Sequence, residues 1–130
     1  NYTPIINKDQ KYLFNNDFVA FKNKSTLFAM TAHIIFNKID NKNTVTHSKK
    51  LIKLIRNKIG FKNLLISDDL SMKSLKGTIK ENTIKTFNAG CNLALHCNGN
   101  FKEMEIVGKN SPKIDKFISK KTSQFYKILS

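Results

Sequence analysis

The sequence predicts an α/β fold built from parallel strands, each followed by a helix. Three short apolar segments each precede a segment whose apolar residues recur at helical spacing, and this alternation is typical of β-strand–helix–β-strand units. The apolar segments lack the polar alternation of a half-exposed strand, as expected for strands covered on both faces. The chain has 130 residues, whereas a complete eight-stranded β/α barrel needs ~250. A closed barrel of that type is therefore excluded.

The N-terminal third contains the first expected helix and strand. Residues 4–6 end an extended segment, and Asp9 follows at the expected N-cap of a helix over residues 10–21. Asp is favoured there because its side chain accepts hydrogen bonds from free amides of the first turn. Residues 27–36 are apolar almost throughout and are predicted to form one buried strand. The polar residues 37–46 are predicted to form a loop.

The central third contains the second helix and strand. Residues 48–58 carry Leu and Ile at helical spacing, and Gly60 follows at the C′ position, where glycine ends many helices. Residues 64–67 are predicted to form a second short buried strand. The acidic pair Asp68 and Asp69 comes directly after it.

The C-terminal third repeats the pattern. Residues 81–89 are predicted to form a helix that ends at Gly90, and residues 93–97 a third strand. Residues 101–107 are predicted to be another helix. The last helix is expected to begin at Pro112, because proline is favoured at the first helical position.

The chain is strongly basic, with 23 Lys plus Arg against 9 Asp plus Glu and a formal net charge of +14. Such a charge attracts phosphates, so nucleic-acid binding is one hypothesis. However, Arg56 is the only arginine, whereas recognition of bases and phosphates favours arginine. The lysines are also spread over every segment. We therefore attribute the lysine content to the base composition of the gene and do not expect a nucleic-acid partner.

Composition also argues against metals and membranes. Cys91 and Cys97 lack zinc-ligand spacing, and the three histidines show no metal-binding pattern. Neither a metal nor a cofactor is therefore expected. No apolar run approaches the ~18 residues of a membrane span, and no signal peptide is recognisable. Two unpaired cysteines suit a reducing compartment, so a cytoplasmic location is expected.

Polar side chains gather where the predicted strands end. Neighbouring strand residues point to opposite faces, so His33 and Asp68 each end a row of inward side chains, and His96 lies near the end of the third strand. Asp69 points the other way from Asp68. In α/β folds this rim carries ligands and catalytic groups.

Each of these residues has a structural alternative. Asp68 fits either a nucleophile or base, or a cap for the following turn. Asp69 fits a hydrogen bond that fixes a loop. His33 and His96 fit either substrate contact or hydrogen bonds to the backbone, and Met72 fits packing. Spacing alone leaves these alternatives open.

The segment 66–72, Ile-Ser-Asp-Asp-Leu-Ser-Met, closely resembles the signature of glycoside hydrolase family 3, in the branch of bacterial β-N-acetylglucosaminidases that recycle cell-wall muropeptides. Residues 88–92 match an Ala-Gly-Cys turn of the same family, except that Asn92 replaces the usual Asp. The resemblance runs over nearly the whole chain. The further segments that agree, in the same order, are residues 29–36 (a strand with Ala-His), 59–61 (Gly-Phe before the nucleophile strand), 88–92 (an Ala-Gly-Cys turn) and 96–99 (His-Cys-Asn-Gly).

The resemblance implies a (β/α)8 barrel, of which residues 1–130 would be a single partial domain: the C-terminal part, with about three β/α units. Family members are retaining enzymes, and the first Asp of the Ser-Asp-Asp motif is their nucleophile. The resemblance implies this role for Asp68. We assign His33 and Met72 to substrate binding, and Asp69 and His96 to structural positions near the site. The implied substrate is a muropeptide that carries β-linked N-acetylglucosamine.

One part of the family pattern is absent. Members carry a Lys-His-Phe/Met-Pro-Gly-His-Gly motif, followed by a loop with the histidine that serves as general acid and base. Neither occurs here, and the chain is expected to begin just after them. The 130 residues alone are therefore predicted to be inactive, with the N-terminal part of the barrel as the missing partner. The alternative is a non-catalytic basic half-barrel with an interaction or nucleic-acid-binding role.

Overall fold

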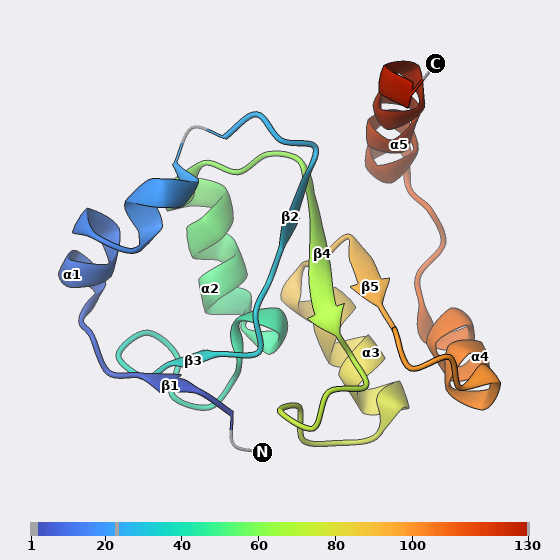
Figure 1. The fold of residues 1–130 in the computed structure, drawn as a ribbon, viewed down its shortest axis with the longest axis horizontal. Helices are drawn as coiled ribbons and strands as arrows, with labels where there is room; N and C mark the ends of the chain where they lie inside the picture. Colours follow the sequence, from blue (N-terminus) through green and yellow to red (C-terminus); the bar gives the residue numbers. More distant parts are fainter. Residues whose placement is uncertain (1–2, 23, 130) are drawn as a thin grey trace.

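The computed structural model describes residues 3–22 and 24–129 and has the predicted α/β class (Figure 1). It contains two parallel sheets, one with the strand order β1-β3 and one with the order β2-β4-β5. Both sheets are parallel throughout, as the strand–helix alternation predicts. The strands are β1 (Ile5–Ile6), β2 (Phe28–Met30), β3 (Ile35–Phe36), β4 (Leu64–Asp69) and β5 (Leu93–Leu95).

Helices connect the strands and line the sheet (Figure 1). A π-helical turn, η3 (Ile55–Ile59), continues α2, and two 3-10 turns, η1 (Phe18–Phe21) and η2 (Val45–His47), precede β2 and α2. None of the helices in the described part of the chain is long and apolar enough to cross a membrane. The α-helices are α1 (Gln10–Asn15), α2 (Lys49–Leu54), α3 (Ile79–Ala89), α4 (Phe101–Asn110) and α5 (Lys116–Leu129).

The prediction of one strand over residues 27–36 is wrong, because this segment forms two strands in different sheets. The amide of Thr31 still donates to the carbonyl of Ile66 in β4, at 2.9 Å. The amide of Ile35 instead donates to the carbonyl of Pro4, at 2.9 Å, beside β1. The hydrogen-bonding partner thus changes within four residues. Apolar composition is the same on both sides of the change and could not reveal it.

The expectation of three strands covered on both faces holds only for β4. Leu64, Leu65 and Ser67 of β4 are almost fully buried. Among the residues that the structure describes, β2 and β5 each pair with β4 alone, so they lie at the edges of this sheet. Their residues are half-buried or, at Met30, exposed.

The predicted helix start at Asp9 and the stops at Gly60 and Gly90 are confirmed, but the helix predicted over residues 10–21 is divided into α1 and the 3-10 turn η1. The side chain of Asp9 accepts a hydrogen bond from the amide of Tyr12, which caps α1. Gly60 and Gly90 follow η3 and α3 with φ angles of 83° and 114°. L side chains rarely adopt this left-handed backbone, so glycine is required at these two stops.

The last helix begins later than predicted. Pro112 lies outside it, and α5 starts at Lys116. The side chain of Asp115 accepts a hydrogen bond from the amide of Ile118 at 2.7 Å, so Asp115 takes the position of an N-cap. Ile118 of α5 is buried, whereas Ile114 precedes the helix and is 75% exposed.

The core consists of two hydrophobic clusters on either side of α2. The first joins α2 to β4 and the end of α3, and the second joins α2 and η3 to α1 and η1. The first cluster packs β4 against the helices through Leu65, the second residue of the strand. The buried members are Ile52, Phe61, Leu65, Ala89 and Cys91 in the first cluster and Leu13, Phe18, Leu54 and Ile59 in the second.

The start of β4 is held by the only arginine. Arg56 donates from Nη1 to the carbonyl oxygens of Phe61 and Asn63, at 3.0 and 2.6 Å, and from Nη2 to Oδ1 of Asn92, at 2.6 Å. The same Asn92 oxygen accepts the amide of Leu65 at 2.9 Å. The neutral Asn92 thus makes the link between β4 and the turn before β5.

Candidate active site

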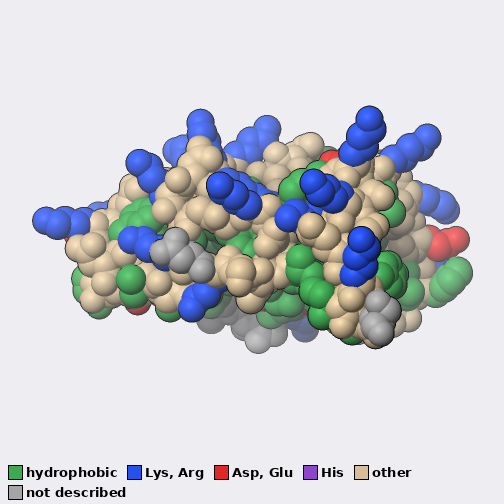
Figure 2. Space-filling view, turned by 90° about the horizontal axis from the view of Figure 1, so that it is seen from above, with side chains coloured by type: hydrophobic (Ala, Val, Ile, Leu, Met, Phe, Trp, Pro, Cys, Tyr) green, Lys and Arg blue, Asp and Glu red, His purple; other side chains and the backbone are tan. Residues whose placement is uncertain are grey.

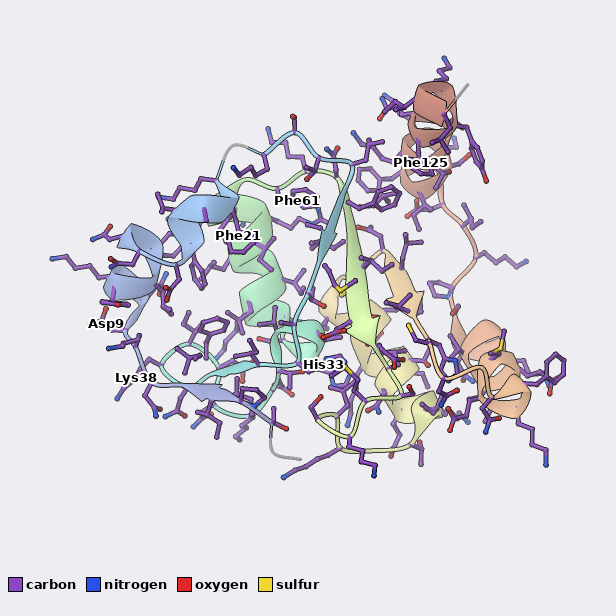
Figure 3. The ribbon with its side chains drawn as sticks, viewed as in Figure 1. Asp9, Phe21, His33, Lys38, Phe61 and Phe125 are labelled. Atoms are coloured by element: carbon purple, nitrogen blue, oxygen red, sulfur yellow. The ribbon has the colours of Figure 1, made fainter. Side chains whose placement is uncertain are left out.

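A pocket of about 600 Å³ lies at the carboxyl end of β4. Four of the five predicted site residues line it, and His96 does not. Figure 3 labels His33 beside the end of β4. The lining residues are Pro4, Ala32, His33, Ile34, Asp68, Asp69, Ser71, Met72, Lys73 and Ser74.

Asp68 is the penultimate residue of β4, which continues to Asp69 and so is two residues longer than the predicted strand. Its Oδ1 accepts a hydrogen bond from the amide of Asp69 at 2.9 Å. Within residues 3–22 and 24–129, no other hydrogen bond or ion pair engages this carboxylate. The pairing of β4 with β5 is irregular between Ile66 and Asp69, and such irregularities re-aim side chains near many active sites. One carboxylate oxygen of Asp68 thus has a hydrogen-bond partner, and among the described residues the other has none.

Asp69 makes the loop-fixing hydrogen bonds expected of it. Its Oδ1 accepts the amides of Ser71 and Cys97, at 3.0 and 3.1 Å, and its Oδ2 accepts the hydroxyl of Ser71 at 2.6 Å. Burial would raise the pKa of Asp69, but these hydrogen bonds and the nearby His96 together hold that pKa below its usual value. The ionised carboxylate therefore joins the loop after β4 to the segment after β5.

His33 does not end a strand face, because β2 stops at Met30 and the chain has turned into a loop. The side chain is only 3% exposed. Its Nε2 lies 2.9 Å from the carbonyl oxygen of Asp69, and its Nδ1 lies 2.9 Å from Oγ1 of Thr46. Both ring nitrogens are thus already engaged inside the protein. No sequence signal marked Thr46, which lies at the edge of the segment predicted to be a loop.

His96 follows β5 and contacts a side chain, where a backbone partner was the expected alternative. Its Nε2 lies 2.8 Å from Oε2 of Glu103 in α4. The side-chain amide of Asn98 donates to the same oxygen at 2.6 Å. The hydrogen bonds from His96 and Asn98 lower the pKa of Glu103. Glu103 escaped the sequence reasoning, although its place three residues after the N-cap Asn100 was a usable signal.

Met72 lies on the loop between β4 and α3 and is 44% exposed. Its amide donates to the carbonyl of Asp69 at 3.1 Å, so its backbone is tied to the residue whose amide binds Asp68. The side chain lines the pocket. Among the described residues, no group of three or more His, Cys, Asp or Glu side chains is placed to hold a metal ion.

The family model described as glycosyl hydrolase family 3 N terminal domain matches residues 1–120. The chain belongs to glycoside hydrolase family 3. This confirms the resemblance found in the sequence. Members of the family are glycoside hydrolases, and the α/β fold with parallel sheets agrees with membership.

Curated relatives narrow the comparison to β-hexosaminidases. The β-hexosaminidase of Methylobacillus flagellatus is 30% identical over 109 residues, which are 80% of this chain and 31% of the relative. That of Actinobacillus pleuropneumoniae is 34% identical over 102 residues, which are 74% of this chain and 30% of the relative. The chain thus spans about a third of the length of these relatives.

The chain is also similar in structure to solved proteins with related names. NagZ from Neisseria gonorrhoeae superimposes with a TM-score of 0.76 at 25% identity, over 90% of this chain and 35% of that one. The β-N-acetylglucosaminidase from Thermotoga maritima gives a TM-score of 0.74 at 25% identity, over 95% and 30%. CbsA from Thermotoga neapolitana gives 0.79 at 23% identity, over 99% and 33%, and shows the fold alone.

The lowered pKa of Asp69 predicts a pH-dependent contribution to stability. The pKa in the folded chain lies below the ~3.9 of an unfolded Asp, so the contribution is complete above about pH 5 and is lost as pH falls through the folded value. We expect Asp69→Asn to lower the free energy of unfolding at pH 7, with a difference from the wild type that shrinks toward pH 2. Urea unfolding at a series of pH values measures this. The matched control is Asp17→Asn, since Asp17 makes no side-chain cap. A difference that stays constant with pH would contradict the assignment.

Proposed function

We propose that this chain carries the nucleophile of a retaining β-N-acetylglucosaminidase and that Asp68 is that nucleophile. The observation that carries the proposal is the state of the Asp68 carboxylate, which stands at the end of β4, on a pocket, with one oxygen fixed by the Asp69 amide. Membership of family 3 and the β-hexosaminidase relatives support the reaction class.

The chemistry follows from the free carboxylate oxygen. In the first step it attacks the anomeric carbon, and the bond from that carbon to the leaving oxygen breaks while an acid protonates the leaving group. Water then hydrolyses the glycosyl ester and restores the carboxylate. The Asp69 amide holds the other oxygen, so attack needs no reorganisation of Asp68. The fixed negative charge also stabilises an oxocarbenium-like transition state.

We assign Met72 to contact with the sugar. It is exposed on the rim of the pocket, and its flexible thioether adapts to irregular apolar surfaces. We assign Asp69 and His96 to the support of the site. The Asp69 side chain binds the segments after β4 and β5, and the His96 side chain binds α4. His33, which we expected to bind substrate, is considered below.

We further propose that the sheet β2-β4-β5 is one part of a (β/α)8 barrel and that the rest of the barrel is supplied by a further N-terminal part. β2 and β5 each pair only with β4 in the described chain, so their outer edges are available for more strands. The chain covers only about a third of its relatives. The proton donor would come from that further part, because the Nε2 atoms of His33 and His96 are already bonded.

The proposed substrate is a muropeptide fragment with terminal β-linked N-acetylglucosamine, and the proposed location is the cytoplasm. The cysteines support a reducing compartment: Cys91 and Cys97 are both free, and exposed free thiols persist where glutathione keeps them reduced. No part of this chemistry requires a cofactor. Figure 2 shows lysines spread over the visible face rather than gathered in a groove, which fits a carbohydrate substrate better than a nucleic acid.

The nucleophile assignment predicts the effect of Asp68→Ala in an enzyme made by joining this chain to the N-terminal part of the Methylobacillus flagellatus relative. Turnover of 4-nitrophenyl β-N-acetylglucosaminide should fall on the order of 10³-fold or more, with folding retained. Azide should restore part of the activity by attacking in place of the carboxylate, and the product should be a glycosyl azide. Asp9→Asn, which keeps a capping side chain, is the matched control. Near-normal turnover by Asp68→Ala would refute the assignment.

The 130 residues alone should release no nitrophenol above the buffer rate. In the described part of the chain, no histidine with a free ring nitrogen lines the pocket, and general acid catalysis is commonly worth ~10²–10⁴-fold. The groups that orient the sugar from the rest of the barrel would also be missing. Addition of the relative's N-terminal part in trans should restore turnover. Robust turnover by the chain alone would contradict the partial-barrel proposal.

A further inference from the structure

Both ring nitrogens of His33 are engaged beside the pocket. The ring is 3% exposed, and each nitrogen has a partner at 2.9 Å: the carbonyl of Asp69 for Nε2 and the hydroxyl of Thr46 for Nδ1. The hydroxyl of Thr46 also lies 2.9 Å from that of Thr31. Both threonines are buried. The ring therefore bridges the loop after β2, the η2 turn and the end of β4.

The chemistry of the partners fixes the direction of these hydrogen bonds. A carbonyl oxygen only accepts, so Nε2 of His33 carries the hydrogen that Asp69 receives. In the neutral ring Nδ1 then accepts the hydroxyl hydrogen of Thr46. The Thr46 oxygen is left to accept from Thr31. The Thr46 hydroxyl could also donate to the carbonyl of Ala32, but that distance is 3.4 Å. It is longer than the 2.9 Å to Nδ1 of His33, so it competes only weakly for the hydroxyl hydrogen.

The end of this chain of hydrogen bonds is next to the proposed nucleophile. The carbonyl of Asp69 accepts from His33, while the amide of Asp69 donates to the carboxylate of Asp68 at 2.9 Å. A shift of residue 69 would therefore move the hydrogen bond that orients Asp68. Misplacement of a reacting group by ~1 Å can cost ~10²-fold in rate.

We propose that His33 is a positioning residue, which holds the Asp69 carbonyl and through it the attack geometry of Asp68, and that it does not bind the sugar. The inference rests on the proposed role of Asp68. It replaces the expectation that His33 contacts substrate, because neither ring nitrogen is free and the ring is buried. A ring reaches across the gap between two loops with fewer rotatable bonds than a linear side chain, so the carbonyl is held firmly.

Spectroscopy tests the hydrogen bond without any need for activity. In the 130-residue chain labelled with ¹⁵N at histidine and ¹³C at carbonyl carbons, we expect His33 to show the Nε2–H tautomer and a scalar coupling from Nε2 to the Asp69 carbonyl carbon. Thr46→Val, which removes the donor to Nδ1 at equal size, should weaken that coupling. An Nδ1–H tautomer, or no coupling to Asp69, would overturn the proposal.

Kinetics test the positioning role in the joined enzyme described above. In His33→Gln, the Gln side-chain amide can reach the place of Nε2, so we expect kcat within about threefold of the wild type, whereas the shorter His33→Asn should lose ~10²-fold in kcat with little change in KM. His47→Gln, at a histidine that does not contact Asp69, is the matched control. Rates are normalised to the folded fraction measured by circular dichroism.

The other outcomes are distinguishable. A sugar-binding His33 would raise KM in both variants, and a purely structural one would lower the folded fraction while leaving kcat per folded molecule unchanged. Either result would overturn the proposal. If Asp68→Ala retained turnover, the proposed function itself would fail, and the coupling between His33 and Asp69 would still be measured independently.

Discussion

The position of Asp68 depends on the hydrogen bonds of its neighbour, Asp69. The amide of Asp69 binds the Asp68 carboxylate, its side chain binds Ser71 and the amide of Cys97, and its carbonyl accepts from His33. These partners come from the segments that follow β2, β4 and β5. Three strand ends are thus tied to one residue, two of them through its backbone and the third through its carboxylate.

The opposite end of the central strand is fixed by independent contacts. Arg56 and Asn92 join the start of β4 to the helix before it and the turn after α3. Leu65 packs between α2 and the end of α3. β4 is thereby held at both ends and along one face, which supports its last carboxylates. In the described part of the chain, β2 and β5 pair with no strand other than β4.

Sequence reasoning located Asp68 and Asp69 because two independent signals meet there, an apolar strand that ends in acids and a family motif. It misplaced His33, since the apolar run 27–36 gives no sign that its hydrogen-bonding partner changes from β4 to β1. It also missed Glu103, whose contact with His96 depends on how α4 packs. Strands and helix caps are set by residues close together in the sequence, so the local pattern predicts them well. Contacts between loops join residues far apart in the sequence and depend on tertiary packing, which the local pattern does not show.

The central claim is that Asp68 forms the covalent bond to the sugar. The most direct test treats the joined enzyme with 5-fluoro-N-acetylglucosaminyl fluoride, whose leaving group needs little help from an acid and whose ring fluorine destabilises the transition state for hydrolysis. Peptide mapping by mass spectrometry should then find one glycosyl adduct, on Asp68, in the peptide that contains residues 66–72. An adduct on Asp69 or Glu103, or no adduct while the fluoride is turned over, would contradict the account.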